Sequence, residues 1–253
     1  MVMVLFTSSI FPSRYESFSP IDYVQSKITE NDIVFLGTRH RQPEILYFFT
    51  DLIPTLKNLG ITHIGLEIPS DEQDAIDQYI SSGNGHSNIQ VHTQIDCPEY
   101  RKLFQALKKA DGPKPVAIDL PYSEYDGNIS RDEWMARSLL KVFEQDPSAK
   151  ILVKVGNLHI FKKLQWQNQL FTNHLSIREY IHRQRPHVKM VSIGQVIDES
   201  VKDCDFSKHF GSIHGSVAID LDERYKGWNL GMTSNIAIEP AECFELLDGL
   251  IIY

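Results

Sequence analysis

The sequence predicts an α/β protein with a mainly parallel central sheet, helices on both faces, and a site at the carboxyl edge of the strands. Short apolar runs rich in β-branched residues alternate with amphipathic helical patterns along most of the 253 residues, which is the order of βαβ units. Two of the runs end in the same form, Gly37-Thr38-Arg39-His40 and Gly156-Asn157-Leu158-His159. Because parallel strands bring their carboxyl ends to one edge of a sheet, where ligands bind, we expect the two histidines to meet.

The first half of the predicted sheet is marked by turn residues. A strand at 33–36 is followed by a helix at 44–59, with Pro43 at its start and Gly60 just past its end, the usual positions for these two residues. Pro54 inside that run predicts a kink or a break.

A second strand, at 61–68, leads into a helix that reaches about residue 80. Ser70 with Gln73 three residues later predicts a capping box at the start of this helix. Residues 81–95 are polar and rich in turn formers, and a loop of this length is often functional.

The later elements repeat the alternation. Ser130 and Glu133 predict a second capping box, which opens the helix at 131–145. The remaining helix is expected at 98–109. The remaining strands are expected at 115–120, 151–155, 188–193, 217–221 and 250–253.

Composition limits the class of protein. A chain of this length with 42% hydrophobic residues can bury an ample core, and we expect one domain over residues 1–253, with 200–245 as an appended hairpin or loop layer. The 25 basic and 33 acidic residues give a net charge of −8. That balance argues against nucleic acid or membrane partners, because both need basic surface.

Localisation follows from the absence of targeting features. No stretch reaches the roughly 20 apolar residues that a spanning helix needs. The apolar start at residues 1–6 has no basic region before it, so it reads as a strand or tail rather than a secretory signal. Cys97, Cys204 and Cys243 are too few and too scattered for a disulfide framework. We therefore expect a cytoplasmic protein, with an oligomeric state that the sequence does not indicate.

Polar side chains stand at the carboxyl ends of the four main strands. They are His40, Glu67, Asp119 and His159. A strand buried on both faces has little room for ionised groups, so the strand ends are where such groups can be used. Two imidazoles with one or two carboxylates form a set that suits a divalent cation such as Zn, Mn, Co or Fe.

Six short motifs also occur in a fixed order along the chain. They are Gly37-Thr38-Arg39-His40, Gly65-Leu66-Glu67, Pro98-Glu99-Tyr100-Arg101, Ala117-Ile118-Asp119-Leu120-Pro121, Arg131-Asp132-x-x-Met135-Ala136 and Gly156-Asn157-Leu158-His159. Together they resemble the Tiki/ChaN/erythromycin-esterase/TraB superfamily over roughly residues 30–165, and residues 248–252 are similar to its last strand.

The branches of this superfamily differ in activity. The Tiki branch carries two Gly-x-x-His motifs and acts as a metal-dependent protease, the esterase branch hydrolyses a macrolide lactone, and the ChaN branch binds haem. The esterase and ChaN branches have Gly-Glu-x-His at the first motif, where this chain has Thr38. The resemblance is therefore closer to the Tiki and TraB form, and an esterase-type role for the missing carboxylate does not carry over.

The resemblance implies which residues form the site. It places His40, Glu67 and His159 there as metal ligands, and it makes Asp119, Arg131 and Asp132 supporting or substrate-facing candidates. Asp132 also has a simpler explanation, because an acidic residue in the first turn of a helix stabilises the helix dipole.

Our first hypothesis is a metal-dependent hydrolase of an ester, lactone or peptide bond in a small-molecule or peptide substrate. The metal would activate a water molecule and polarise the carbonyl. Glu67 or Asp119 would act as general base, and Arg131 would stabilise the developing oxyanion.

Two alternatives stay open. One is a noncatalytic haem-binding protein of ChaN type, with a tyrosine (Tyr100, Tyr122 or Tyr125) or Cys97 as the iron ligand. The other is a metal-free esterase that uses His40 as the base. His86 and His92, in the long loop, are candidates to cover the site in any of these cases.

Overall fold

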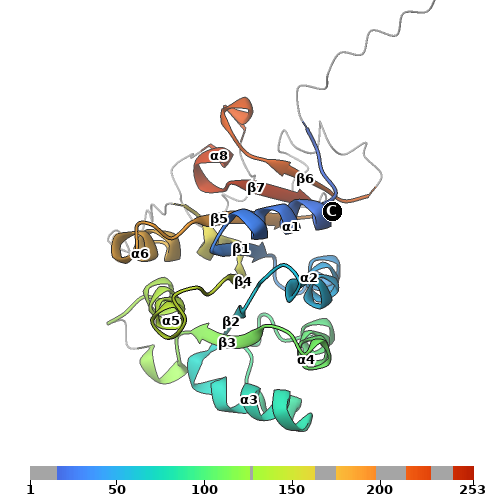
Figure 1. Ribbon diagram of the computed structural model, residues 1–253, viewed down its shortest axis with the longest axis vertical. Coiled ribbons are helices and arrows are strands. Elements are labelled where there is room, and N and C mark those ends of the chain that lie inside the picture. The colour runs from blue at the N-terminus through green and yellow to red at the C-terminus, as the bar shows by residue number, and fades with distance from the viewer. Residues whose placement is uncertain (1–15, 126–127, 163–174, 198–214, 229–241) are drawn as a thin grey trace, which may run out of the picture.

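The fold is built on one seven-stranded sheet in the order β3-β2-β4-β1-β5-β7-β6 (Figure 1). The computed structural model describes residues 16–125, 128–162, 175–197, 215–228 and 242–253. Every neighbouring pair is parallel except β6 with β7, so the predicted α/β class with a mainly parallel sheet is confirmed. The strands are β1 Ile33–Thr38, β2 His63–Pro69, β3 Lys114–Asp119, β4 Ile151–Gly156, β5 Met190–Val196, β6 Val217–Asp220 and β7 Gly249–Ile252.

Helices cover both faces of this sheet (Figure 1). On one face α1, α2 and α4 supply buried apolar residues, and on the other face α5, α6 and α8 do so. α3 packs against α4 and against the edge strand β3. The helices are α1 Pro20–Glu30, α2 Pro43–Leu56, α3 Gln73–Ser82, α4 Pro98–Ala110, α5 Arg131–Gln145, α6 Ile177–Gln184 and α8 Cys243–Leu246.

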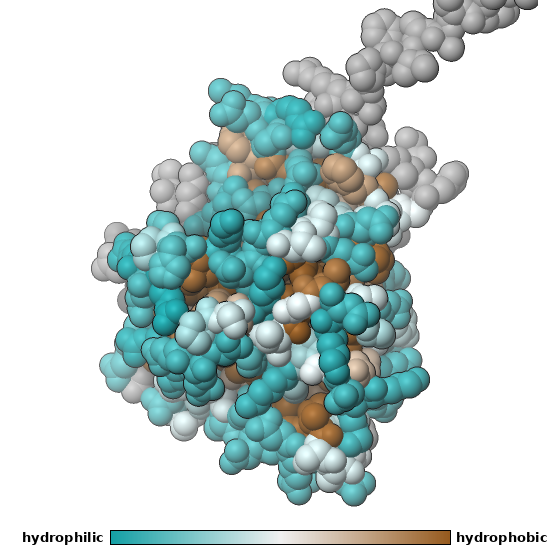
Figure 2. Space-filling view, in the orientation of Figure 1, coloured by the Kyte–Doolittle hydropathy of each residue, from teal (hydrophilic) through white to brown (hydrophobic). Residues whose placement is uncertain are grey.

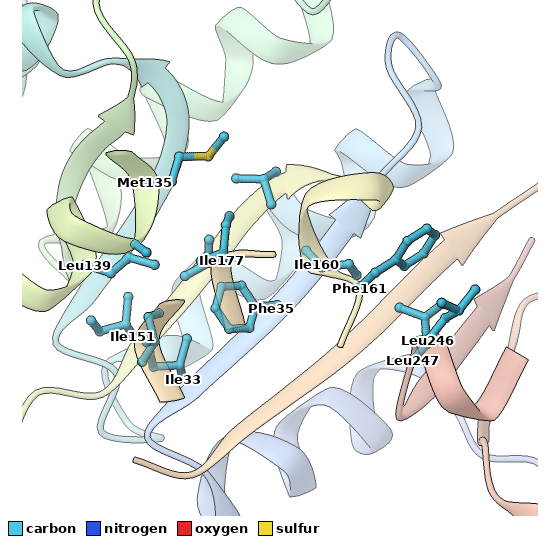
Figure 3. Close-up of a cluster of buried hydrophobic side chains, with 14 of the residues drawn as sticks. Ile33, Phe35, Met135, Leu139, Ile151, Ile160, Phe161, Ile177, Leu246 and Leu247 are labelled. Carbon is cyan, nitrogen blue, oxygen red and sulfur yellow. The ribbon is translucent and has the colours of Figure 1, made fainter. Parts of the chain in front are cut away.

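Alternation along β4 divides the core into two layers. Ile151, Val153 and Val155 face α5 and α6, while Leu152 faces α2 and α4. Figure 3 shows the first layer, in which Phe35 of β1 lies among Leu139 of α5 and Ile177 of α6. Burial of the sheet on both faces explains why its strands read as nearly continuous apolar runs.

The predicted capping box at Ser70 is wrong. Ser70–Glu72 forms a 3-10 turn, and α3 begins only at Gln73, without a side-chain cap. The Gln73 amide instead accepts a hydrogen bond from Ala117 N at 2.8 Å and donates one to Pro115 O at 3.1 Å. Gln73 thus takes the place of a neighbouring strand at the edge of β3, where unpaired backbone groups otherwise remain.

Other expectations differ in smaller ways. α1 and α6 were not expected, and α2 continues through Pro54 to end at Leu56. At α5, Ser130 does accept a hydrogen bond from Glu133 N. The apolar start at residues 1–6 and most of 200–245 lie outside the described residues, and the assignment of one domain stays a prediction.

The surface is mostly hydrophilic on the face drawn in Figure 2, with hydrophobic residues visible between the helices. Among the described helices, none combines the length and the hydropathy needed to span a bilayer.

Candidate functional site

The polar residues predicted at the strand ends converge beside a cavity of ≈ 300 Å³ at the carboxyl edge of the sheet. The cavity is lined by His40, Glu67, His92, Tyr122, Tyr125 and Arg131, among others. Strands β1, β4, β2 and β3 are consecutive neighbours in the sheet, so their ends fall side by side. The residues that line the cavity therefore lie up to 91 positions apart in the chain, from His40 to Arg131.

Gly156 is the point around which the three predicted metal ligands meet. A Cβ atom built on Gly156 would lie 3.3 Å from His40 Cε1, 3.7 Å from Glu67 Oε2 and 3.7 Å from His159 Cδ2. The Gly156 N–H also donates a hydrogen bond to Glu67 Oε2 at 2.7 Å. A glycine at the end of β4 thus leaves room for the close approach of both imidazoles and the carboxylate.

Arg131 joins the two buried carboxylates of the site. Its Nη2 donates to Glu67 Oε1 at 2.8 Å and to Asp119 Oδ2 at 2.5 Å, and its Nε donates to Asp119 Oδ1 at 3.0 Å. The Glu67 and Asp119 side chains are only 5% and 0% exposed, and buried charges need such partners. Since Arg131 is bound by both acids, it acts as their counter-ion, and its expected role as an oxyanion donor stays a prediction.

These partners keep both acids ionised. Burial alone raises the pKa of Glu67, but the His159 imidazole and the Arg131 guanidinium outweigh it, and the pKa is lowered. Burial also raises the pKa of Asp119, yet hydrogen bonds from His92 and Arg131 lower it to about 2. Opposite charge and hydrogen bonding to the charged form thus outweigh desolvation at both acids.

Glu67 lies beside an irregularity at the end of β2. The register between β2 and β3 shifts between Leu66 and Pro69, which places Glu67 at a bulge-like position. Such irregularities re-aim a side chain at the end of a strand. Leu66 and Ile68 stay in the core on one side of β2, and alternation along the strand turns the Glu67 carboxylate to the other side, where it meets Arg131.

His159 is held by Asp132. The His159 Nδ1 and Asp132 Oδ1 atoms are 2.5 Å apart, and His159 Nε2 lies 3.6 Å from Glu67 Oε1. Burial lowers the pKa of His159, but the charge and hydrogen bond of Asp132 raise it above the ordinary value. Asp132 therefore has a role beyond the helix dipole, because it orients the imidazole and favours its charged form.

The turn that carries His159 is fixed by Asn157. Its amide pairs with the backbone of Gln195, donating to O at 2.7 Å and accepting from N at 3.1 Å. The absence of a side chain at Gly37 makes this possible, since a Cβ there would lie 2.3 Å from Asn157 Oδ1. The glycine of the first motif thus makes room for the asparagine of the second.

His40 is the imidazole of the site without a fixed partner. It is exposed at the cavity and forms no hydrogen bond with any residue that the structure describes. Burial against the site lowers the pKa of His40, with Lys154, His159 and Arg131 adding to the effect and Glu67 opposing it. A neutral imidazole with its nitrogens free can accept a proton.

The donors around Gly156 do not fit the predicted metal centre. Within the described residues, no group of three or more His, Cys, Asp or Glu side chains is arranged to hold a metal ion. Glu67 already accepts hydrogen bonds at both oxygens, from Arg131 and from Gly156. A guanidinium beside that carboxylate repels a second cation, so the metal roles of His40, Glu67 and His159 gain no support from this geometry.

His92 and Tyr122 have a larger part in the site than the sequence indicated. His92 Nε2 lies 2.9 Å from Asp119 Oδ2, and Tyr122 Oη lies 2.7 Å from His92 Nδ1. The ring of Tyr122 stacks on that of Tyr125, with centroids 5.8 Å apart. The only signals in the sequence were a histidine in the long polar loop and a tyrosine three residues after a strand-end aspartate.

Lys154 is a second feature that the sequence analysis missed. It is buried in β4, with Nζ 4.4 Å from the centroid of the Tyr100 ring, and burial lowers its pKa to about 8. A lysine within an otherwise apolar run was the available signal.

Tyr100 is itself fully buried, which removes it from the candidate haem ligands, while Cys97 is a half-buried free thiol.

Several solved structures have the same fold at low sequence identity. The erythromycin esterase mutant EreC H289N in its open conformation has a TM-score of 0.68 and 10% identity, over 91% of this chain and 92% of that one. A succinoglycan biosynthesis protein has a TM-score of 0.64 and 12% identity, over 95% and 94%. ChaN of Campylobacter jejuni, in a structure with cofacially bound haem, has a TM-score of 0.52 and 13% identity, over 92% and 91%.

These likenesses show that the chain shares its fold with an erythromycin esterase and with a ChaN protein, as the predicted resemblance implied. No protein-family model and no curated protein sequence matches the chain. Because one fold supports many activities, function has to be argued from the site.

Proposed function

We propose that this protein hydrolyses an ester or lactone bond in a small molecule, with His40 as the general base. The observation that carries the proposal is the arrangement around Gly156, where His159 and the ionised Glu67 lie beside His40, which has no hydrogen-bond partner among the described residues and lines the cavity. The fold shared with an erythromycin esterase supports the same reaction class.

His40 is suited to activate water. Its lowered pKa leaves the imidazole neutral at neutral pH, and its exposure at the cavity lets a water molecule reach a ring nitrogen. In the proposed reaction, His40 removes a proton from this water as the oxygen attacks the carbonyl carbon. A positioned base of this kind accelerates hydrolysis by about 10²- to 10⁴-fold.

His159 is suited to stabilise the charge that develops on the carbonyl oxygen. Its Nδ1 is bound to Asp132, and its Nε2 lies 3.6 Å from Glu67 Oε1, outside hydrogen-bonding range. The raised pKa of His159 favours a proton on Nε2. In our proposal this N–H turns to the oxyanion, while Arg131 holds Glu67 and Asp119 in place.

The proposal assigns no step to a metal ion, because Glu67 and His159, two of the three predicted donors, already have partners within the protein. A divalent metal remains part of our first sequence-based hypothesis, in which it would activate water at His40, Glu67 and His159. The two versions differ in one measurable respect, which is the response of the activity to a chelator.

The test uses the purified protein with an aryl ester, an alkyl ester and a macrolactone, each with and without EDTA. We expect hydrolysis that resists EDTA and falls by about 10²-fold or more in His40→Gln. The matched control is His182→Gln, which changes an exposed histidine on α6 away from the cavity. Loss of activity in EDTA, restored by Zn or Mn, would support the metal hypothesis, and full activity in His40→Gln would refute the assigned base.

Haem binding is the second candidate, and one observation favours it. Tyr122 and Tyr125 line the cavity and are 50% and 48% exposed, and phenolates bind ferric haem in some proteins. The fold shared with ChaN supports this reading. Titration with hemin would show a Soret shift that is lost in Tyr122→Phe or Tyr125→Phe but kept in His159→Gln, and the absence of any shift would exclude this candidate.

A further inference from the structure

A chain of three side chains runs from the buried core of the site to its surface. Asp119 is fully buried, His92 is partly buried, and Tyr122 is 50% exposed at the cavity. His92 bonds to Asp119 through Nε2 at 2.9 Å and to Tyr122 through Nδ1 at 2.7 Å. Both ring nitrogens are thus engaged, and the outer end of the chain is a hydroxyl that solvent or a substrate can reach.

The directions of these hydrogen bonds follow from the charge on Asp119. This carboxylate accepts hydrogen bonds from Arg131 and from Leu120 N, and it is ionised, so the proton between it and His92 lies on Nε2. In neutral His92 the Nδ1 atom is then an acceptor, and Tyr122 donates its O–H to it. When His92 is charged, Nδ1–H donates to Tyr122, and the tyrosine O–H is released toward the cavity.

The chain can therefore pass a proton outward without forming a phenolate. Burial and the nearby Asp119 carboxylate raise the pKa of Tyr122, so its hydroxyl stays protonated. A proton that leaves the Tyr122 O–H is replaced by the one on His92 Nδ1. Asp119 holds the imidazole in both states, as the orienting acid does in other catalytic triads.

We propose that Asp119, His92 and Tyr122 form the acid arm of this site, with Tyr122 as the catalytic residue that protonates the leaving group. The inference rests on the proposed hydrolase function. When the carbon–oxygen bond of the tetrahedral intermediate breaks, the leaving oxygen takes the Tyr122 proton, and Tyr122 takes the Nδ1 proton of His92. His92 regains a proton through cavity water from His40, which took one from the attacking water. One water is consumed, and a carboxylic acid and an alcohol are formed.

The arrangement gives the two cavity histidines opposite tasks. His40 has no fixed partner among the described residues and no carboxylate hydrogen-bonded to it, which suits a base. His92 is hydrogen-bonded to Asp119 at one ring nitrogen and to Tyr122 at the other, which suits a group that passes a proton outward. Both side chains line the same cavity, so one substrate can contact both.

Tyr125 provides a matched control. It stacks on Tyr122 at an interplanar angle of 26°, and its exposure of 48% is close to the 50% of Tyr122. It forms no hydrogen bond with His92, whose ring centroid is 6.5 Å from its own. Tyr122→Phe and Tyr125→Phe therefore remove the same hydroxyl from similar surroundings, and only one of the two belongs to the chain.

The test compares ethyl butyrate with p-nitrophenyl butyrate. An alkoxide needs a proton to leave, whereas p-nitrophenolate leaves without one. We expect Tyr122→Phe and His92→Gln to lower kcat/KM for the ethyl ester by about 10²-fold and to leave the aryl ester within about threefold. The ratio of the two rates should keep its wild-type value in Tyr125→Phe, even where the overall rate changes.

The outcomes separate this inference from the proposed function. If the wild-type protein hydrolyses neither ester, the proposed function falls and the acid arm falls with it. If the wild-type protein hydrolyses both esters, two results would overturn the acid arm alone. One is that Tyr122→Phe slows both esters equally. The other is that Tyr125→Phe shifts the ratio of the two rates as much as Tyr122→Phe does. Histidine ¹⁵N NMR adds a check that does not depend on activity, because a neutral His92 with its proton on Nδ1 would contradict the assigned directions.

Discussion

Replacing Arg131 by methionine tests the central electrostatic claim about the site. Arg131 makes three hydrogen bonds to Glu67 and Asp119, and methionine keeps much of the volume while removing the charge. Loss of one partner from a buried ion pair destabilises a protein by about 3–5 kcal/mol. Because the Arg131 side chain is 31% exposed, we expect the lower end of this range, about 3 kcal/mol at pH 7.

The effect should depend on pH in a defined direction. The pKa of Asp119 is lowered from 3.8 to about 2, so in the wild type this group contributes about 2 kcal/mol that is present above pH 3.8 and lost as the pH falls through 2. Without the guanidinium the pKa of Asp119 rises, and its protonation at low pH relieves the unpaired charge. The difference in the free energy of unfolding between wild type and variant should therefore become smaller as the pH is lowered from 7 to 4.

Urea unfolding of both proteins at pH 7 and pH 4 measures these free energies. Arg137→Met is the matched control on the same helix, because Arg137 is 58% exposed and pairs with Glu133 four residues earlier. We expect this control to change stability by no more than about 0.5 kcal/mol. Equal losses in the two variants at pH 7, or a difference that widens in acid, would refute the reasoning.

Three further predictions concern the supports of the site. Gly37→Ala should lower stability by about 2–3 kcal/mol, because its Cβ would lie 2.3 Å from Asn157 Oδ1. Gly112→Ala is the control and should have little effect in thermal unfolding, because the nearest neighbour of its Cβ lies at 3.7 Å. Similar losses of stability in the two variants would contradict this prediction. Lys154→Met should raise the free energy of unfolding at pH 7 by about 1–3 kcal/mol, since burial lowers the lysine pKa from 10.5 to about 8. This gain in stability should shrink as the pH rises from 8 to 10.5. Urea unfolding at pH 7 and pH 10 measures the gain, and a loss of stability in the variant would argue against the prediction. Asp132→Asn should lower the pKa of His159, which Asp132 raises, and an unchanged value in an NMR titration would exclude Asp132 as the cause.

Much of the site could be located from the sequence because its residues follow apolar runs. A buried strand is a local pattern, and the residue at its end is found by counting along the chain, which is how His40, Glu67, Asp119 and His159 were identified. Arg131 and Asp132 came from the resemblance of a motif. Their roles in catalysis stay predictions.

What could not be predicted was the pairing of these residues. Glu67 is bound to Arg131, 64 positions away, and Asp119 is bound to His92, which comes before it in a loop. Gln73 was expected to cap a helix, but it pairs with the edge of β3. Such contacts depend on distances between elements, and no short sequence pattern carries that information.

The sequence by itself determined the alternation of strands and helices, the parallel sheet and the set of polar residues at its edge, because hydrophobic periodicity and turn residues act locally. Only the tertiary structure decided which of those residues are charged, which have a hydrogen-bond partner in the site and which of them has none among the described residues. Burial and neighbouring charges set the pKa of a side chain, and both arise only when distant segments pack together. This is why His40 and His159, which end two similar motifs, differ in their partners and in the direction of their pKa shifts.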